Sequence, residues 1–381
     1  FAGVLMDIQR YYDGRIEENL KSGKVLVVYG PRRTGKTTMI KKFAEKFSGK
    51  YFYEIGEDRE LRELLESESV AKITGFFSRF DLVIIDEAQM IQKIGTGLKI
   101  LVDRVPGIKV IASGSSSFDL SNKIGEPLTG RKNTVTLFPV SMIEASDFIG
   151  DFEIQRRIEE FLIYGTYPEV FTENSYEGKK ILLEELRNSY LFKDILALEN
   201  VKNPRKLLDL LMLISFQIGK EVSLTELGNS LDLAKQTVER YLDLLEKTFI
   251  IKKVGGFSRN LRKEVTKSSR YYFLDNGVLN SVTNNFKPLN LRNDAGQLWE
   301  NFLFTERLKK QAYHRIYSNN YFWRTYDMQE IDLVEERDGK LYGFEFKLNP
   351  KKIKAPRSWS ENYPESEFLQ VNKDNYLGFI T

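Results

Sequence analysis

Cysteine is absent from this 381-residue sequence, and histidine occurs once, as His314. The lack of cysteine excludes disulfides, thiolate metal sites and cysteine nucleophiles. A single histidine excludes zinc sites built from several histidines, and nothing around His314 suggests a serine–histidine–aspartate triad. We therefore expect any chemistry to depend on carboxylates, lysine, hydroxyl groups and Mg²⁺.

Long apolar runs are also missing. No stretch reaches about 18 apolar residues, so we expect no membrane-spanning helix. The first six residues are too short, and lack the basic start, for a secretion signal. Together with the absence of cysteine, this predicts a cytoplasmic protein. The length and a hydrophobic fraction of 41% are typical of two or three domains, each with its own core.

Acidic residues are scarce in one stretch of an otherwise balanced chain. The net charge is only +3, but residues 252–270 hold seven lysine and arginine residues against one acid, Glu264. A basic segment on a slightly acidic remainder predicts contact with a polyanion such as DNA. A solvated, lysine-rich loop is the alternative that the composition leaves open.

The motif Gly-Pro-Arg-Arg-Thr-Gly-Lys-Thr-Thr at residues 30–38 organises the first half of the chain. The apolar residues 25–29 before it predict a buried strand, and residues 39–44 after it predict a helix. A strand, a glycine loop and a helix in this order are the context of a phosphate-binding P-loop. The two glycines let backbone N–H groups turn toward a phosphate chain. The predicted nucleotide-binding residues are Gly30, Pro31, Arg32, Arg33, Thr34, Gly35, Lys36, Thr37 and Thr38.

A second motif supplies the acids that such a loop needs. Lys36 would place a positive charge near the β- and γ-phosphates, and Thr37 would offer its hydroxyl to Mg²⁺. Residues 81–87 are an apolar run that ends in two acids, which predicts a parallel strand with its carboxyl end at the ligand. We expect Asp86 to hold Mg²⁺ and Glu87 to polarise the water that attacks the γ-phosphate.

Two further segments complete the predicted sheet. Residues 109–117 predict a strand that ends in hydroxyl side chains, and in P-loop ATPases with an additional strand a polar residue here senses the γ-phosphate. Ser113 and Ser115 are the candidates, with a serine-rich turn as the alternative. Arg131, before a predicted strand at residues 134–139, could stabilise transition-state charge in its own or a neighbouring subunit. The second role requires a homo-oligomer, and a plain surface arginine is the alternative.

Guanine recognition is not indicated. The Asn-Lys-x-Asp stretch that reads guanine in GTPases is missing, because Asn122-Lys123 continues with Ile124-Gly125. The acid pair at the end of residues 81–87 also suits ATP hydrolysis better than phosphate transfer to a small molecule. We therefore expect ATP and Mg²⁺ as the cofactors.

Taken in order, these motifs resemble one group of AAA+-type ATPases of bacteria and archaea that carry a C-terminal nuclease-like domain. The resemblance covers essentially the whole chain. It implies an α/β fold with a parallel P-loop sheet, followed by a helical lid over the nucleotide in residues 140–219. The matching segments are residues 30–38, 85–89, 113–116, 128–131, 165–170 and 190–194.

The middle of the chain predicts a winged-helix domain. Residues 223–226 are typical of a capping box, and residues 235–247 predict a second helix with one apolar face. A strand at residues 249–251 and a returning strand at residues 271–274 enclose the basic segment 252–270, which would form the wing. Such a wing would bind DNA phosphates with salt-sensitive affinity. Winged helices also dock proteins, so a protein partner stays open.

The C-terminal residues resemble the PD-(D/E)XK nuclease arrangement. An acid on a predicted helix precedes two predicted strands, and the second strand carries a Glu-x-Lys motif. Because strand side chains alternate, Glu345 and Lys347 emerge on the same face. The resemblance implies that Glu300, Asp332 and Glu345 hold Mg²⁺, with Lys347 beside the attacking water. A nuclease-like fold kept for binding without cleavage stays open.

The sequence thus predicts four domains and a coupled function. We expect a Mg²⁺-dependent ATPase whose C-terminal half interacts with DNA and carries a candidate endonuclease site. The alternative is an ATP-controlled regulatory or assembly switch whose C-terminal half is a protein-docking module without nuclease activity. The predicted domains are a P-loop ATPase domain at residues 1–147, a helical lid or connector at 148–220, a winged-helix domain at 221–285 and a nuclease-like domain at 286–381.

Overall fold

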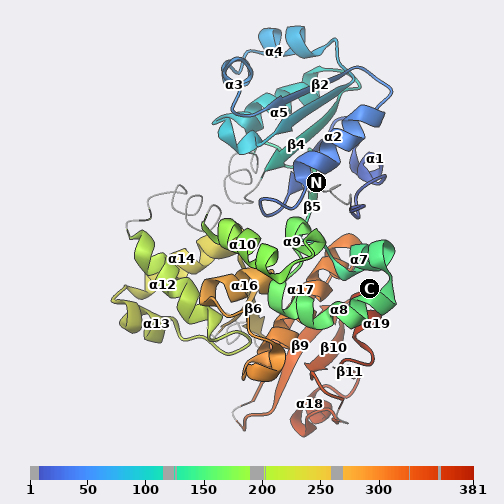
Figure 1. The fold of residues 1–381 in the computed structure, drawn as a ribbon. Helices are drawn as coiled ribbons and strands as arrows, with labels where there is room; N and C mark the ends of the chain where they lie inside the picture. The colour runs from blue at the N-terminus through green and yellow to red at the C-terminus, as the bar shows by residue number, and fades with distance from the viewer. Residues whose placement is uncertain are drawn as a thin grey trace. The chain divides into compact units, whose positions relative to one another are not determined.

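The computed structural model describes residues 8–114, 124, 127–188, 201, 203–258, 269–325, 327–350 and 353–381. They form two compact units, residues 8–139 with 247–249 and residues 140–246 with 250–381 (Figure 1). The main segment of the first unit ends at Pro139, whereas the predicted ATPase domain extends to residue 147. Three predicted features lie outside the described residues: Ser115, the segment 190–194 and most of the basic wing, residues 259–268.

The first unit is built on a parallel five-stranded sheet with the order β2-β3-β4-β1-β5. Both β1 and β3 are buried along their whole length, as expected for parallel strands covered on both faces. Because β4 lies between β1 and β3, the three carboxyl ends with the predicted motifs meet at one edge of the sheet. The predicted parallel sheet is confirmed. The strands are β1 (Val25–Tyr29), β2 (Tyr51–Ile55), β3 (Leu82–Asp86), β4 (Lys109–Gly114) and β5 (Lys132–Thr136).

Helices connect these parallel strands and cover the sheet. Leu65, Phe77 and Leu98 pack in one fully buried core with the strand residue Val83. The helix after the P-loop begins directly after Gly35, whose left-handed backbone (φ 89°) ends the loop. The helices are α1 (Ile16–Asn19), α2 (Lys36–Lys46), α3 (Arg59–Glu66), α4 (Val70–Phe77), η1 (Ala88–Met90) and α5 (Ile94–Arg104).

The second unit combines helices with a mixed six-stranded sheet of the order β11-β10-β9-β8-β6-β7. The strands are β6 (Ile251–Gly256), β7 (Ser269–Phe273), β8 (Asn319–Arg324), β9 (Glu330–Arg337), β10 (Lys340–Phe346) and β11 (Glu367–Val371). The helices that precede β8 along the chain are α7 (Met142–Ile149), α8 (Asp151–Tyr164), α9 (Pro168–Thr172), α10 (Tyr176–Leu186), α12 (Pro204–Ser215), α13 (Leu224–Leu231), α14 (Lys235–Lys247), α16 (Asn276–Thr283), η3 (Leu289–Leu291) and α17 (Ala295–Tyr313). Two short helices, α18 (Arg357–Asn362) and α19 (Tyr376–Ile380), follow β10 and β11.

The hairpin of the predicted winged helix belongs to the same sheet as the nuclease-like strands. β6 and β7 pair antiparallel, and the end of β6 pairs in parallel with β8. Phe257, just after β6, packs with Trp323 and Trp359, and its N–H donates to the carbonyl of Phe322 at 2.7 Å. The pairing covers a strand edge that would otherwise expose unpaired N–H and C=O groups. The predicted boundary after residue 285 therefore falls within one continuous sheet.

The predicted apolar face of α14 is confirmed. Val238, Tyr241, Leu242 and Leu245 are buried in the described structure. The exposed side of the helix includes Lys235, Gln236, Glu239 and Arg240. Ser223 caps the preceding helix α13 by accepting a hydrogen bond from the Glu226 N–H at 3.3 Å. This division of faces leaves the polar side of α14 available to solvent.

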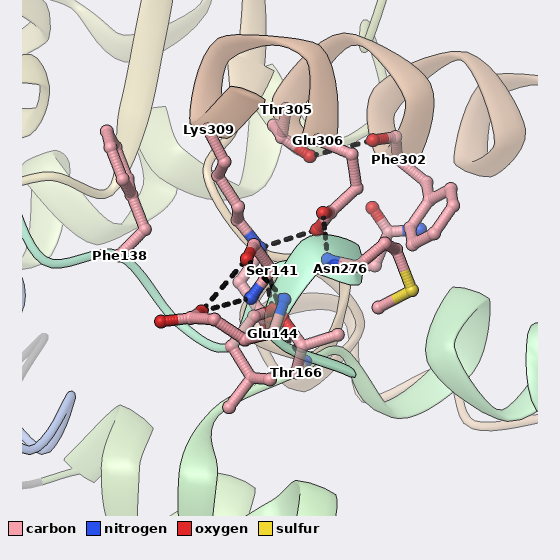
Figure 2. Close-up of polar contacts among 12 residues, drawn as sticks. Phe138, Ser141, Glu144, Thr166, Asn276, Phe302, Thr305, Glu306 and Lys309 are labelled. Carbon is pink, nitrogen blue, oxygen red and sulfur yellow. Dashed lines mark hydrogen bonds and ion pairs between the residues drawn. The ribbon is translucent and has the colours of Figure 1, made fainter. Parts of the chain in front are cut away.

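A buried polar cluster ties the long helix α17 to the first residues of the second unit (Figure 2). Lys309 donates to Glu306 at 2.6 Å, to the Val140 carbonyl at 3.1 Å and to the Thr166 hydroxyl at 3.2 Å. The other carboxylate oxygen of Glu306 accepts from the Met142 N–H at 2.7 Å. The two charged side chains are only 3% and 2% exposed, so they satisfy one another away from water.

Among the described residues, no helix combines the length and apolar character needed to cross a membrane.

Candidate functional site

The P-loop encloses its own lysine. The Lys36 ammonium donates to the carbonyls of Gly30 at 2.8 Å and Pro31 at 2.7 Å, and the residue is 5% exposed. Thr34 donates its hydroxyl to the same Pro31 carbonyl at 2.9 Å. The loop also contains Arg33 in the left-handed region, at φ 58°. These contacts hold the loop in a curved form with the charge of Lys36 at its centre, as the P-loop motif predicts.

Burial makes this charge costly. It lowers the pKa of Lys36 to about 8, while the nearby carboxylates of Glu87 and Asp86 oppose the shift. A bound polyphosphate would supply the negative charge that this buried ammonium lacks. The side chains of Arg32, Arg33 and Thr38 are exposed.

Arg10, which sequence reasoning missed, also holds the P-loop in place. Its guanidinium donates to the Thr34 carbonyl and, at 2.6 Å, to the Phe138 carbonyl beyond β5. At Gly30 the P-loop backbone passes close to the segment after β5. A Cβ atom there would lie 2.1 Å from the Leu137 carbonyl oxygen, so only glycine fits. Arg10 precedes the motif by twenty residues and has no local signal, so only the fold shows its role.

The carboxylate of Asp86 is the centre of the site. Thr37 donates to its Oδ2 at 2.6 Å, Tyr53 donates to the same oxygen at 2.9 Å, and Ser113 donates to Oδ1. Asp86 is 2% exposed and Ser113 is fully buried. The P-loop, the acidic strand and the strand between them thus meet at one carboxylate. Tyr53 is a second residue that sequence reasoning missed, because it lies in the middle of a strand with no motif.

Glu87 is turned out of the strand. Its backbone is left-handed (φ 49°), and its N–H donates to the Ser113 hydroxyl at 3.3 Å. Its carboxylate accepts a hydrogen bond from the Gln89 side chain. Gly56 makes room for this turn, since a Cβ atom there would lie 2.5 Å from the Glu87 carbonyl oxygen. The carboxylate is therefore displaced from the strand and partly exposed, where a water molecule can reach it.

The donors present fit Mg²⁺ bound together with a nucleotide. The hydroxyl of Thr37 and the carboxylate of Asp86 are hard oxygen ligands that already lie side by side. Mg²⁺ in such sites takes one or two protein oxygens and completes its shell with phosphate and water. A cage of three carboxylates is not required.

Arg131 is placed away from this site. It directly precedes β5, and its carbonyl accepts from the N–H of Val25 at the start of β1. The P-loop follows the opposite, carboxyl end of β1, a strand length away. The Arg131 side chain pairs with Asp103 at 2.7 Å. Within its own subunit the Arg131 side chain therefore lies away from the P-loop, and its action on transition-state charge stays a prediction.

The nuclease-like residues come together in the second unit. Asp332 on β9 accepts from the Phe346 N–H at 2.8 Å, and Lys347 pairs with Glu345 at 2.7 Å. Glu300 on α17 reaches the same cluster, where its charge and that of Asp332 affect one another. The predicted spacing therefore brings these four side chains to one place, although none of the described acidic and histidine side chains form a group of three or more suited to a metal ion.

An arginine that the sequence analysis assigned to the exposed basic segment enters this cluster. Arg270 on β7 is 3% exposed, and its Nη1 lies 3.8 Å from an oxygen of both Glu300 and Asp332. Arg270 is one of the seven basic residues of segment 252–270, but the pairing of β7 within the sheet buries its side chain. Tyr272, two residues on, donates to Glu300 at 2.7 Å.

Burial dominates the acid–base properties of the cluster. It raises the pKa of Asp332 to about 7, with a further rise from the charge of Glu345 and an opposing effect of the Phe346 N–H. Burial also raises the pKa of Glu300 well above its usual range, and the charge of Asp332 adds to the shift.

Three families match successive parts of the chain. Residues 22–146 match an AAA domain family, residues 155–289 a domain of unknown function (DUF8612), and residues 295–379 another domain of unknown function (DUF4143). The first match covers the P-loop, the acidic strand and the strand of Ser113. Residues 22–146 are therefore similar to AAA domains, and their geometry agrees with a P-loop nucleotide site.

The similar proteins that span most of the chain are themselves uncharacterized. A protein of Mycobacterium tuberculosis is 28% identical over 339 residues, which cover 87% of this chain and 72% of that protein. A protein of Methanocaldococcus jannaschii is 23% identical over 338 residues, covering 84% and 74%. A protein of Haemophilus influenzae is 22% identical over 380 residues, covering 92% and 87%.

Three solved structures show distant similarity to this chain. A DNA replication initiation factor has a TM-score of 0.26 at 18% identity, over 61% of this chain and 85% of that chain. A signal transduction ATPase with numerous domains from Pyrococcus horikoshii has a TM-score of 0.28 at 15% identity, over 78% and 44%. AMPPCP-bound DnaA from Aquifex aeolicus has a TM-score of 0.24 at 17% identity, over 58% and 81%. Scores this low do not establish a common overall fold.

Proposed function

We propose that the first unit hydrolyses ATP with Mg²⁺ and that the second unit uses the nucleotide state to act on DNA. The single observation that carries the first part is the convergence of Thr37, Tyr53 and Ser113 on the carboxylate of Asp86, beside Lys36. P-loop NTPases use such a lysine, hydroxyl and carboxylate at the β- and γ-phosphates and Mg²⁺.

Each side chain has a separate task in this proposal. Lys36 exchanges its two carbonyl contacts for phosphate oxygens and neutralises charge that develops in the transition state. Thr37 and Asp86 would hold Mg²⁺, which offsets phosphate charge when bound. Glu87 accepts a proton from the attacking water as the new P–O bond forms and the bond to ADP breaks. The Ser113 hydroxyl donates to Asp86 and accepts from the Glu87 N–H, and so fixes the positions of the two acids relative to one another.

Contact with DNA is proposed from charge and exposure in the second unit. The polar side of α14 exposes Lys235 and Arg240, and β6 exposes Lys252 and Lys253. Such side chains bind phosphates without reading sequence, and this binding weakens as salt rises. The winged-helix assignment of α13, α14 and the β6–β7 hairpin is part of this proposal.

The proposal is tested by phosphate release from Mg²⁺-ATP with and without duplex or single-stranded DNA. Lys36→Ala should abolish nucleotide binding, whereas Glu87→Gln should bind ATP and fail to turn it over. Lys46→Ala, an exposed lysine at the end of α2, is the matched control and should keep full activity. Normal turnover by Glu87→Gln would refute its assigned role.

DNA contact is tested separately by fluorescence anisotropy. We expect affinity to fall steeply between about 50 and about 200 mM salt, and to be weaker in Lys235→Ala/Arg240→Ala. Lys340→Ala, on an exposed end of β10, is the control. An ATPase rate that DNA does not change, together with an absence of salt-sensitive binding, would refute the DNA part alone.

A regulatory switch with a protein-docking C-terminal half is the second candidate. The observation that favours it is the burial of Arg270 among the acids that a metal nuclease would need. DNA nicking with Mn²⁺ by the wild-type protein, lost in Asp332→Ala, would instead establish the predicted nuclease role of Glu300, Asp332, Glu345 and Lys347.

A further inference from the structure

The carboxylate cluster of the second unit has a cation of its own. Nη1 of Arg270 lies 3.8 Å from Glu300 Oε1 and 3.8 Å from Asp332 Oδ1. A nuclease of the predicted type would need a divalent cation between these two acids. Two positive charges cannot share that position without strong repulsion.

The Arg270 guanidinium also contacts Glu330 and the ring of Phe322. Its Nη2 donates to Glu330 at 3.0 Å, and its carbon atom lies 4.4 Å from the centre of the Phe322 ring. Arg270 belongs to β7, which pairs with β6 along its whole length. An arginine fixed by a strand, an aromatic face and an acid loses little additional entropy when it contacts Glu300 and Asp332.

Other groups also block access of a metal ion to the Glu300 carboxylate. Tyr272 donates to the same oxygen, Oε1, at 2.7 Å. The backbone at Gly219 passes over the carboxylate so closely that a Cβ atom there would lie 2.5 Å from Oε1. A metal ion that binds Glu300 would therefore have to displace the Tyr272 hydroxyl and the Arg270 guanidinium, next to the backbone of Gly219.

We propose that Arg270 is the resident cation of this cluster, where it neutralises Glu300 and Asp332 and excludes a divalent metal ion from the space between them. The cluster then acts as an internal ion network that fastens the β6–β7 hairpin to α17 and β9. Lys347 neutralises the remaining acid, Glu345, at 2.7 Å. The proposal is independent of ATP hydrolysis in the first unit.

A carboxylate oxygen of Glu345 would be available to a metal ion if Arg270 were removed. Oε2 of Glu345 is buried and has no hydrogen-bond partner among the residues that the structure describes. Removal of Arg270 would free Oδ1 of Asp332 within the same cluster. Two carboxylates then offer the hard oxygen ligands that Mn²⁺ and Mg²⁺ prefer.

The test is Mn²⁺ binding by nucleotide-free protein, followed by electron paramagnetic resonance. Wild type and Asp332→Asn should bind Mn²⁺ equally, because the cluster holds none. Arg270→Gln should gain about one Mn²⁺ per chain, and Arg270→Gln/Asp332→Asn should lose it again. Arg324→Gln removes a different arginine of the same sheet, paired with Glu221 at 2.8 Å, and should gain nothing.

Two results would overturn the proposal. One is a Mn²⁺ site in the wild-type protein that disappears in Asp332→Asn, since this would show that Arg270 does not exclude the metal. The other is a folded Arg270→Gln protein without the additional site. Should Arg270→Gln fail to fold, the comparison of wild type with Asp332→Asn still decides, and neither result depends on ATPase activity.

Discussion

Replacement of Lys309 by methionine should destabilise the second unit in a pH-dependent way. The change keeps most of the side-chain volume and removes the charge, together with hydrogen bonds to Glu306, Val140 and Thr166. Among the described residues, Glu306 then keeps only the Met142 N–H as a hydrogen-bond donor to its buried carboxylate. Breaking a buried ion pair in this way costs about 3–5 kcal/mol.

The sign of the pH dependence follows from Glu306. Burial raises the pKa of Glu306, and Lys309 is the largest influence that lowers it again. Without Lys309 the folded-state pKa rises further above the unfolded value, so the unfolded protein releases its proton first as pH increases. Stability should therefore fall as pH rises above about 4.5, by about 1.4 kcal/mol per pH unit until the folded-state pKa is reached.

Urea unfolding followed by tryptophan fluorescence measures this effect in the second unit alone. All three tryptophans of the chain, Trp299, Trp323 and Trp359, lie in that unit. The variant should lose about 3–5 kcal/mol at pH 8 and clearly less at pH 5. Adding Glu306→Gln should remove the pH dependence that Lys309→Met introduces.

The matched control is Lys310→Met on the same helix. This lysine is half-buried and donates to the Gly378 carbonyl at 3.1 Å, so its loss should cost about 1 kcal/mol or less. The reasoning would be refuted by a loss below about 1 kcal/mol for Lys309→Met at pH 8, or by an equal loss at pH 5.

Three further predictions concern the first unit. Gly30→Ala should abolish Mg²⁺-ATP binding in calorimetry because its Cβ would meet the Leu137 carbonyl at 2.1 Å, whereas Gly75→Ala, with open space in α4, should bind normally. Tyr53→Phe removes one donor to Asp86 and should lower Mg²⁺-dependent turnover about 5-fold, an effect of about 1 kcal/mol; an unchanged rate would contradict the assigned contact. Because the pKa of Lys36 is about 8, the charged ammonium is lost above that pH, and ATP should bind about 10-fold more weakly at pH 9 than at pH 7. A Kd that stays constant over this range would show that the neutral amine suffices.

The nucleotide site was largely predictable because its signals are local. Residues 30–38 and 81–87 combine apolar strands with glycine, lysine and acids in a spacing that needs no distant partner to be read. The parallel sheet then follows, since strands separated by helices pair in parallel. The alternation of strand side chains placed Glu345 and Lys347 on one face, whereas Glu300 came from a predicted helix; the nuclease role of these residues stays a prediction.

The parts that sequence reasoning missed depend on contacts between distant segments. Arg10 reaches the P-loop, and Tyr53 and Gly56 support the two acids, from positions that carry no motif. Arg131 directly precedes β5, a neighbour of the P-loop strand, yet the direction of β5 puts it at the opposite end of the strands from the P-loop.

The sequence by itself therefore determined that the chain carries a P-loop and a buried acidic strand, since these motifs follow from local backbone and side-chain chemistry. Only the tertiary structure decided what surrounds Glu300 and Asp332. Arg270 lies in a run of lysines and arginines that composition alone describes as a solvated, basic segment. Because β7 pairs with β6, and β6 with β8, the Arg270 side chain is buried and its guanidinium contacts Glu300 and Asp332. No local pattern encodes that direction, because it depends on which strands become neighbours.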